Sequence, residues 1–111
     1  MSHGQFADCI EACDACAAEC DQCASACLGE AKVDMMRECI RLDRDCASIC
    51  RLASQFMASG SAFAVELCKL CVSICVSCAA ECERHEAAHC QTCAKACRRC
   101  ARACGMVAED G

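Results

Sequence analysis

The stretch from Cys9 to Cys27 reads CIEACDACAAECDQCASAC. Its six cysteines are separated by steps of four, three, four, three and four residues. At about 100° per residue on a helical wheel, they fall within a stripe about 80° wide, which is typical of the buried seam of an α-helix. A helical bundle normally fills this seam with Leu, Ile and Val, whereas this segment fills it with thiols.

The same spacing recurs along the rest of the 111-residue chain, whose nineteen cysteines form four groups. The third and fourth groups both show steps of three, four, three and four residues, and this repeat predicts a left-handed supercoil. The second group has three cysteines, on an inward stripe that also contains Met35, Ala53, Met57 and either Leu42 or Asp43. The complete set is Cys9, Cys13, Cys16, Cys20, Cys23, Cys27, Cys39, Cys46, Cys50, Cys68, Cys71, Cys75, Cys78, Cys82, Cys90, Cys93, Cys97, Cys100 and Cys104.

Glycines and short polar segments between the cysteine groups predict the helix boundaries. Proline is absent and alanine is abundant, which favours helix throughout. Ser61 is placed to cap the start of the third helix, and Gly105 is expected to end the fourth. Because the connections are short, consecutive helices should be antiparallel. The predicted fold class is all-α, a single domain over residues 1–111 built as an antiparallel up-down-up-down four-helix bundle with a cysteine-lined core and helices at about 5–28, 32–58, 62–84 and 87–104.

Charge and hydropathy argue against several classes of partner. The formal net charge of −5 disfavours nucleic acid, which usually binds to a basic surface. No stretch of about 18 apolar residues is present, so no membrane span is predicted. The N-terminal residues have neither the basic nor the apolar region of a signal peptide, and the protein is therefore expected in the reducing cytoplasm.

Nineteen thiols in helical register call for an explanation beyond packing, since Cys fills less volume than Leu and makes a weak core. Neighbours at i,i+3 and i,i+4 have Cβ atoms about 5–6 Å apart, whereas a disulfide needs about 3.8 Å. The geometry allows disulfides between helices, but a reducing compartment disfavours them. Metal binding is favoured over both, because thiolates are soft ligands for Cu(I), zinc or iron–sulfur clusters.

The spacing favours Cu(I) among these metals. Structural zinc sites usually present their cysteine pairs from tight turns, and the ferredoxin-type cluster motif is absent. A sulfur that bridges two Cu(I) ions suits a ladder of helical thiols. One monovalent ion per thiolate keeps a buried core neutral, which predicts about 19 Cu(I) per chain and an affinity that falls as the pH falls. A metallothionein-like buffer for Zn(II) or Cd(II) is the alternative.

Antiparallel helices distribute the remaining residues between the two ends of the bundle. At one end apolar side chains are predicted to form a plug, made of Phe6, Leu52, Phe56, Met57, Phe63, Leu67, Met106 and Val107. Near Cys27, Cys82 and Cys90, the other end collects Met35, Met36, His85 and His89. Thioether and imidazole groups both bind Cu(I), so metal is expected to enter at the second end, and these four residues are candidate ligands.

Each of these candidates also has a simpler interpretation. The methionine pair could be ordinary packing, and the two histidines could be loop residues in solvent. Asp43 lies on or beside the inward stripe and is a further candidate ligand. A surface salt bridge with Arg41 or Arg44 would account for Asp43 equally well.

Three segments are the most specific in the chain: CIRLDRDC at 39–46, CERH at 82–85 and HCQTCAKAC at 89–97. With them, the chain resembles over nearly its whole length the bacterial copper storage proteins, four-helix bundles whose cysteines bind many Cu(I) ions. The resemblance implies that the inward cysteines are copper ligands, that Asp43 occupies an Asn or Asp position near the cluster, and that His85 lies near the open end. It also implies a homotetramer of bundles and, without a secretion signal, the cytosolic branch of the family.

The expected function is storage and sequestration of Cu(I), which would limit copper toxicity and supply a copper chaperone or copper enzyme. Enzyme activity is not expected, because a thiol oxidoreductase would need one or two distinctive cysteines of low pKa, whereas these are near-equivalent. The bundle is also expected to fold without metal, because its Ala-rich helices and its plug do not depend on copper.

Overall fold

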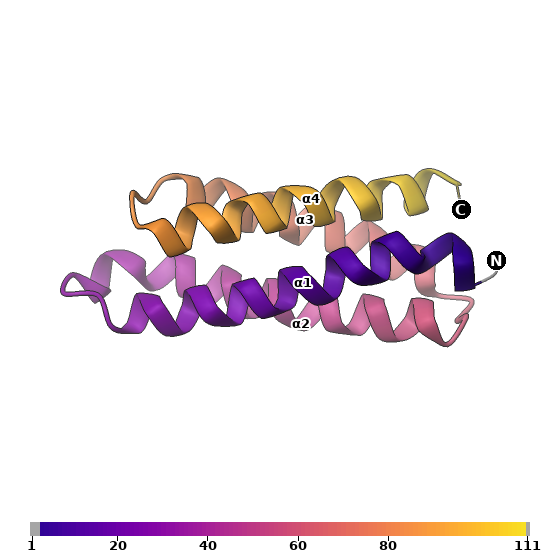
Figure 1. Cartoon of the computed structure of the whole chain (residues 1–111), viewed down its shortest axis with the longest axis horizontal. Coiled ribbons are helices and arrows are strands. Elements are labelled where there is room, and N and C mark those ends of the chain that lie inside the picture. Colours follow the sequence, from indigo (N-terminus) through magenta and orange to yellow (C-terminus); the bar gives the residue numbers. More distant parts are fainter. Residues whose placement is uncertain (1–2, 111) are drawn as a thin grey trace.

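Four α-helices account for most of residues 3–110, the part of the chain that the computed structural model describes. They are α1 (His3–Leu28), α2 (Arg37–Ala58), α3 (Ala64–Glu83) and α4 (Ala88–Asp110), with a short 3-10 turn, η1 (Val33–Met36), before α2. All four helices run along the 47 Å length of the molecule, as Figure 1 shows. The predicted all-α four-helix fold is confirmed.

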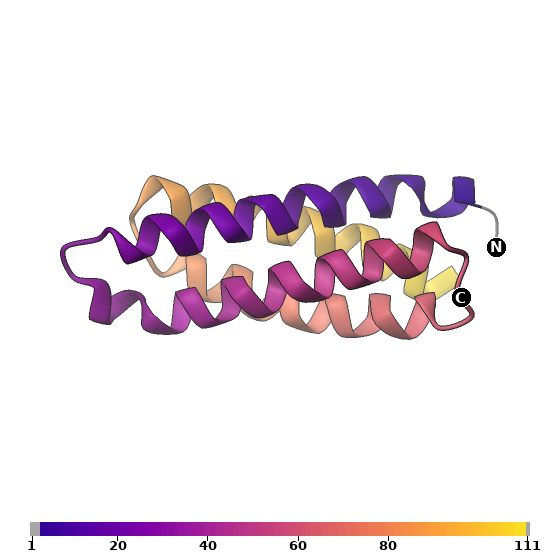
Figure 2. The same cartoon turned by 90° about the horizontal axis from the view of Figure 1, so that it is seen from below.

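Consecutive helices are antiparallel and pack around one core. Both α1 and α3 contact α2 and α4, so α1 and α3 lie diagonally across the bundle. Figures 1 and 2 place both chain termini and the α2–α3 connection at one end, and the α1–α2 and α3–α4 connections at the other. We call the first the plug end, since it contains Phe6 and Met57, and the second the histidine end, since it contains His85 and His89.

Small side chains lie between the helices, and cysteines fill the centre. Ala12, Ala47, Ala79 and Ala94 are buried, and their methyl groups let neighbouring backbones approach closely. All nineteen cysteines are buried as well. The bundle is only 19 × 17 Å across, so the core is a narrow column of sulfur atoms bounded by alanine.

The end of α2 explains the sharp turn into α3. Gly60 has φ 67°, a left-handed conformation that glycine adopts without steric cost. Its N–H donates to the carbonyl of Met57 at 3.1 Å, and the N–H of Ser61 donates to the carbonyl of Phe56 at 3.0 Å. This pair of bonds is a Schellman motif, which satisfies the last carbonyls of the helix. The break that the sequence predicted near Gly60 is therefore a defined helix cap.

Three boundaries differ from the sequence prediction. Residues 33–36 form a 3-10 turn and α2 begins at Arg37, so the second helix starts later than residue 32. Ser61 was expected to cap α3, but the helix begins at Ala64, and the Oγ of Ser61 accepts from the N–H of Phe63, the residue just before the helix, at 3.1 Å. The expectation that Gly105 ends α4 is wrong, because the helix continues to Asp110.

The continuation of α4 past Gly105 follows from burial. Val107 lies almost one turn beyond Cys104 on the same face and is only 7% exposed. Burying a valine contributes about 1.5–3 kcal/mol, whereas glycine in a helix costs about 1 kcal/mol relative to alanine. The extra turn thus covers the plug end of the core. Among the described helices, none combines the length and the apolar character that crossing a bilayer requires.

Candidate metal centre

The thiols of the four helices meet in one continuous column. Neighbouring Sγ atoms lie between 3.1 Å apart, for Cys9 and Cys104, and 4.0 Å apart, for Cys27 and Cys39. Most of these contacts join different helices, as between Cys46 of α2 and Cys75 of α3 at 3.6 Å. The inward stripes that the sequence predicted are therefore brought together into a single site.

Sets of four thiols along the column are close enough to share one metal ion. In each set all Sγ atoms lie within 4.8 Å of one another. The sets overlap, because Cys16 and Cys46 belong to two of them and Cys20 and Cys97 also join two. Examples are Cys13, Cys71, Cys100 and Cys104; Cys16, Cys46, Cys50 and Cys75; Cys16, Cys20, Cys46 and Cys97; Cys20, Cys78, Cys93 and Cys97; and Cys23, Cys27, Cys39 and Cys90. Shared members suit sulfurs that bridge ions, and isolated four-sulfur sites would not need them.

The sulfur spacing fits metal ligation better than disulfides. A disulfide bond is about 2.05 Å long, well below the shortest Sγ distance of 3.1 Å, and all nineteen cysteines are free. Two sulfurs bound to one ion at about 2.3 Å in a trigonal arrangement lie about 4 Å apart. The i,i+4 pair Cys16–Cys20 is separated by 3.9 Å, and so is Cys100–Cys104. An ion could therefore bind between neighbouring thiols with little movement of either helix.

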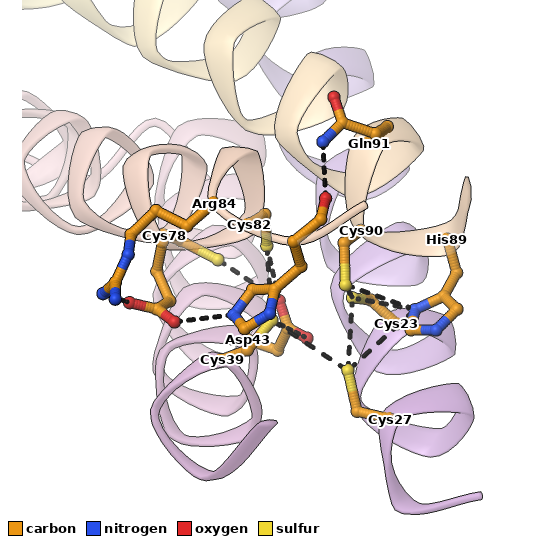
Figure 3. A network of polar contacts seen from close by, with 12 residues as sticks. Cys23, Cys27, Cys39, Asp43, Cys78, Cys82, Arg84, His89, Cys90 and Gln91 are labelled. Atoms are coloured by element: carbon orange, nitrogen blue, oxygen red, sulfur yellow. Dashed lines mark hydrogen bonds and ion pairs between the residues drawn. The ribbon is translucent and has the colours of Figure 1, made fainter. Parts of the chain in front are cut away.

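Asp43 places a carboxyl group inside this column, beside thiols of the histidine end. It is fully buried, and its two oxygens accept hydrogen bonds from the thiols of four cysteines: Cys39 at 3.8 Å, Cys78 at 3.3 Å, Cys82 at 3.6 Å and Cys93 at 3.3 Å. Figure 3 shows three of these thiols around it. The surface salt bridge considered from the sequence is wrong, since Arg41 instead pairs with Glu38. Asp43 belongs to the core, where it can contact metal.

Burial changes the acidity of Asp43 and of the thiols near the histidine end. Desolvation, with repulsion from Cys93, raises the pKa of Asp43 from 3.8 to about 8, although thiol hydrogen bonds act in the opposite direction. Burial likewise raises the pKa of Cys90 to about 11, and it also raises that of Cys27. In the empty protein these two thiols are therefore neutral, and a bound metal would have to displace their protons.

His89 points into the column at the histidine end. Its Nδ1 lies 3.6 Å from the Sγ of Cys23, 3.6 Å from that of Cys90 and 3.9 Å from that of Cys27. Dashed lines mark these contacts in Figure 3. Its Nε2 lies 3.0 Å from a carboxylate oxygen of Glu30. A proton on Nε2 that is donated to Glu30 leaves the Nδ1 lone pair facing the three thiols. The prediction that His89 lies beside cysteines at this end is confirmed.

His85 lies at the same end but is oriented differently. Its Nε2 is 2.8 Å from Glu81, and Glu81 also accepts a hydrogen bond from Arg84 at 3.0 Å. The side chain of Gln91 donates to the carbonyl of His85 at 2.7 Å and so fixes the α3–α4 connection (Figure 3). The side chains of His85 and Glu81 are 15% and 10% exposed. His85 is therefore a largely buried imidazole of the histidine end that is held by a carboxylate.

The two methionines of this end differ in burial. Met36 is 6% exposed, whereas Met35 is 67% exposed. Both line a surface hollow of about 570 Å³ together with His85 and Glu30. A smaller hollow of about 210 Å³ is lined by Cys23 and His89 among others. The surface is thus hollowed above the thiols at the histidine end, where the sequence predicted that metal enters.

The plug end is closed by fewer residues than the sequence predicted. Phe6, Met57 and Val107 are buried, and Phe56 and Leu67 pack against the core. The other three predicted members are exposed and do not contribute: Leu52 at 41%, Phe63 at 65% and Met106 at 67%. Leu52 and Met106 each lie two residues, or about 200°, beyond an inward cysteine of their helix and so face away from the core, and Phe63 lies in the α2–α3 connection. The plug is therefore smaller but still apolar.

Two carboxylates of the histidine end were not predicted from the sequence. Glu81 lies in the last turn of α3, four residues before His85, which follows the end of that helix, so the pairing could have been found from spacing. Glu30 contacts His89 from the α1–η1 connection, 59 residues away in sequence. A tertiary contact of this kind leaves no signal in the local sequence.

Comparisons with known proteins agree with this architecture. A family profile described as "Copper storage protein" matches residues 2–109. The Cu(I)-bound copper storage protein BsCsp3 is 46% identical, with 94% of this chain and 98% of that chain covered and a TM-score of 0.91. The apo form of copper storage protein 3 from Bacillus subtilis is also 46% identical, with coverages of 93% and 98% and a TM-score of 0.86.

A third solved structure shows the same fold in another organism. It is a cytosolic copper storage protein from Streptomyces lividans with five coppers, 35% identical, with 96% of this chain and 94% of that chain covered and a TM-score of 0.93. No curated protein matches the chain.

Proposed function

The chain belongs to the copper storage protein family, and we propose that its sulfur column stores Cu(I), with about one ion per cysteine. The observation that carries the proposal is the close packing of the buried, free thiols: neighbouring four-thiol sets share members, and further Sγ contacts between helices extend them into a column. A protein that needed one or two reactive thiols would not bury all nineteen. This burial supports a store with a large capacity over a thiol enzyme.

Charge supports Cu(I) over a divalent metal. Each thiol that binds Cu(I) loses one proton and gains one positive charge, so the buried core stays neutral as it fills. One divalent ion per four thiolates would leave about two uncompensated negative charges per site, which is costly in a buried core. The Cu(I)-bound relatives likewise favour copper over the Zn(II) or Cd(II) buffer considered from the sequence.

All nineteen cysteines are proposed as ligands, and imidazole nitrogens are proposed to contribute at the histidine end. His89 is the strongest of these, because its Nδ1 faces three thiols within 3.9 Å. Asp43 accepts hydrogen bonds from four thiols and is proposed as an oxygen neighbour of bound metal. Met36 and His85 line the hollow above the column, and Met35 does so from a largely exposed position.

Copper is proposed to enter and leave at the histidine end. The hollows that reach Cys23, His89 and His85 lie there, whereas Phe6 and Met57 close the opposite end. Changing His85, Met35 and Met36 together to Ala should slow Cu(I) loading and removal. The same measurement on Met106→Ala, an exposed methionine of the plug end, provides the control. Unchanged rates in the triple variant would contradict the entrance.

The surroundings of the protein are proposed by analogy with its relatives. The Streptomyces lividans relative is described as cytosolic, and a reducing cytosol would keep nineteen thiols free to bind metal. There the protein would protect the cell from free Cu(I) and supply a copper chaperone or a copper enzyme. Assembly as a homotetramer of bundles is also proposed, and its mass in solution would test this.

Anaerobic titration of the reduced protein tests the storage function directly. With a chromophoric Cu(I) chelator as competitor, binding should continue to about one ion per cysteine while the far-UV helical signal is retained. The same helical signal should be present before any metal is added. Saturation at four or five Zn(II) ions, with tighter competition by zinc than by copper, would overturn the proposal.

A matched pair of variants separates thiol ligation from packing. Replacing Cys16, Cys20, Cys46 and Cys97 by Ser removes one of the four-thiol sets and should lower the capacity by about four ions. Ala47→Ser adds a hydroxyl at a buried alanine of α2 without removing a thiol, and it should leave the capacity unchanged.

A further inference from the structure

Met57 ends the sulfur column at the plug end. It lies in the last turn of α2, is fully buried, and its Sδ is 3.6 Å from the Sγ of Cys68. From the sequence, Met57 was assigned to the apolar plug as a packing residue. The contact shows that the side chain presents its sulfur, and not only methylene groups, to the thiol.

The neighbours of Cys68 differ from those of a thiol deep in the column. Cys50, for example, has four other thiols within 3.9 Å, contributed by α2, α3 and α4. Cys68 has the thioether of Met57 at 3.6 Å, and the thiols of Cys9 and Cys104 also face it. Met57 therefore occupies the position that a further thiol holds in the inner layers.

A thioether at this position suits Cu(I) chemically. Cys thiolate and Met thioether are both soft ligands that select Cu(I). Two sulfurs bound to one trigonal ion at about 2.3 Å lie about 4 Å apart, close to the distance of 3.6 Å between Met57 and Cys68. The thioether is neutral, so it completes the coordination of an ion without adding charge where Phe6 excludes water.

We propose that Met57 is a thioether ligand of the Cu(I) ion held at the plug end together with Cys68, an inference that rests on the proposed storage function. On binding, Cys68 releases its proton to solvent as the thiolate–copper bond forms, and the lone pair of the Met57 sulfur forms a second bond. The plug is thus both the apolar seal of the column and its last ligand.

Selenium X-ray absorption tests this bond in the intact protein. The chain has five methionines, so Met35, Met36 and Met106 are changed to Leu and the protein is labelled with selenomethionine, which leaves selenium at Met57 and at the initiator Met1. After anaerobic loading with about one Cu(I) per cysteine, the selenium spectrum should contain a selenium–copper scattering path. The path should disappear in the same protein with Met57→Leu and should be lost or weakened with Cys68→Ser.

The outcomes distinguish this inference from the storage function. A protein that binds about 19 Cu(I) but shows no selenium–copper path would overturn the ligand role of Met57 and leave storage intact. A chain that binds no Cu(I) would overturn both. The path is measured in protein that retains Met57, so the result does not depend on how well Met57→Leu folds. As a second readout, Met57→Leu should lose about one Cu(I) per chain to a chelator about tenfold more readily than the parent protein does.

Discussion

The histidine end and the plug end close the same sulfur column with opposite chemistry. At the histidine end, both imidazoles are held by carboxylates, His89 faces the last thiols, and the surface is hollowed. At the plug end, Phe6 is 2% exposed and Met57 is fully buried, with its sulfur against Cys68. The comparison shows that a column of similar thiols can have two different ends. The thiols provide the capacity for metal, and the few residues around the last thiols determine the end at which metal passes.

Asp43 lies between the two ends and is expected to give the largest effect. Its carboxylate accepts from Cys39, which belongs to the thiol set of the histidine end, and from Cys78 and Cys93, which belong to the next set. Its pKa of about 8 in the folded protein exceeds the unfolded value of 3.8, so the folded state retains a proton that the unfolded state releases. The free energy of unfolding of the apo protein should therefore fall as the pH rises from 3.8 to about 8.

The size of this loss follows from linkage. It approaches about 1.4 kcal/mol per pH unit, or roughly 3–4 kcal/mol between about pH 5 and pH 8. In Asp43→Asn this contribution should be absent. Denaturant unfolding of both proteins under reducing, anaerobic conditions at several pH values measures the difference, since the cysteines are common to both. If the free energy of unfolding depends on pH in the same way in the parent protein and in Asp43→Asn, the assignment of a raised pKa to Asp43 is wrong.

Removal of the aromatic ring at the plug end should give the next largest effect. Phe6→Ala deletes a buried side chain and should destabilise the apo protein by about 3 kcal/mol. Phe63→Ala is the matched control, because Phe63 is 65% exposed at the same end and should change stability by less than about 0.5 kcal/mol. Similar losses in the two variants would show that the plug is not limited to the buried residues.

Loss of the imidazole at the histidine end should affect metal transfer more than stability. His89→Ala removes the nitrogen that faces three thiols and should slow Cu(I) uptake from a chelating donor by about tenfold or more. Stopped-flow measurement of uptake, with Met106→Ala as a control at the plug end, checks the prediction. Equal rates in the two variants would remove the functional distinction between the ends.

The smallest expected effect concerns the carboxylate that orients His89. Glu30→Ala should slow uptake by a few-fold to about tenfold, because the imidazole is no longer held with Nδ1 toward the thiols. Glu30→Gln keeps a carbonyl oxygen that can accept from Nε2 and should recover part of the rate. Glu66→Ala removes the same charge from an exposed position on α3 and is the control. If Glu30→Ala and Glu66→Ala behave alike, Glu30 acts only through its charge.

Much of this molecule could be predicted from its sequence because the cysteine repeat is strict. Steps of three and four residues place every Cys of a helix on one face, and short connections then bring the four faces together. The same reasoning put Asp43 at the edge of the inward stripe and His89 beside Cys90. Both lie within or next to the column in the structure.

Residues outside the repeat were predicted less well, and the reasons are physical. Phe63 and Met106 share an end with Phe6 but project to solvent, since position along the bundle does not fix direction around a helix. Gly105 did not end α4 because the burial of Val107 outweighs the cost of glycine in a helix. Glu30 reaches His89 across the bundle, a contact that only the tertiary structure defines.

The central claim is that the sulfur column holds one Cu(I) per thiol and that each ion replaces one proton, so that the core stays neutral. Native mass spectrometry of the fully loaded protein tests this claim most directly. Both the number of coppers and the number of protons lost can be read from the mass of the chain. We predict about 19 coppers, each replacing one proton, in a chain whose nineteen cysteines are otherwise unmodified. Saturation at four or five ions, or fewer protons lost than coppers bound, would contradict this account.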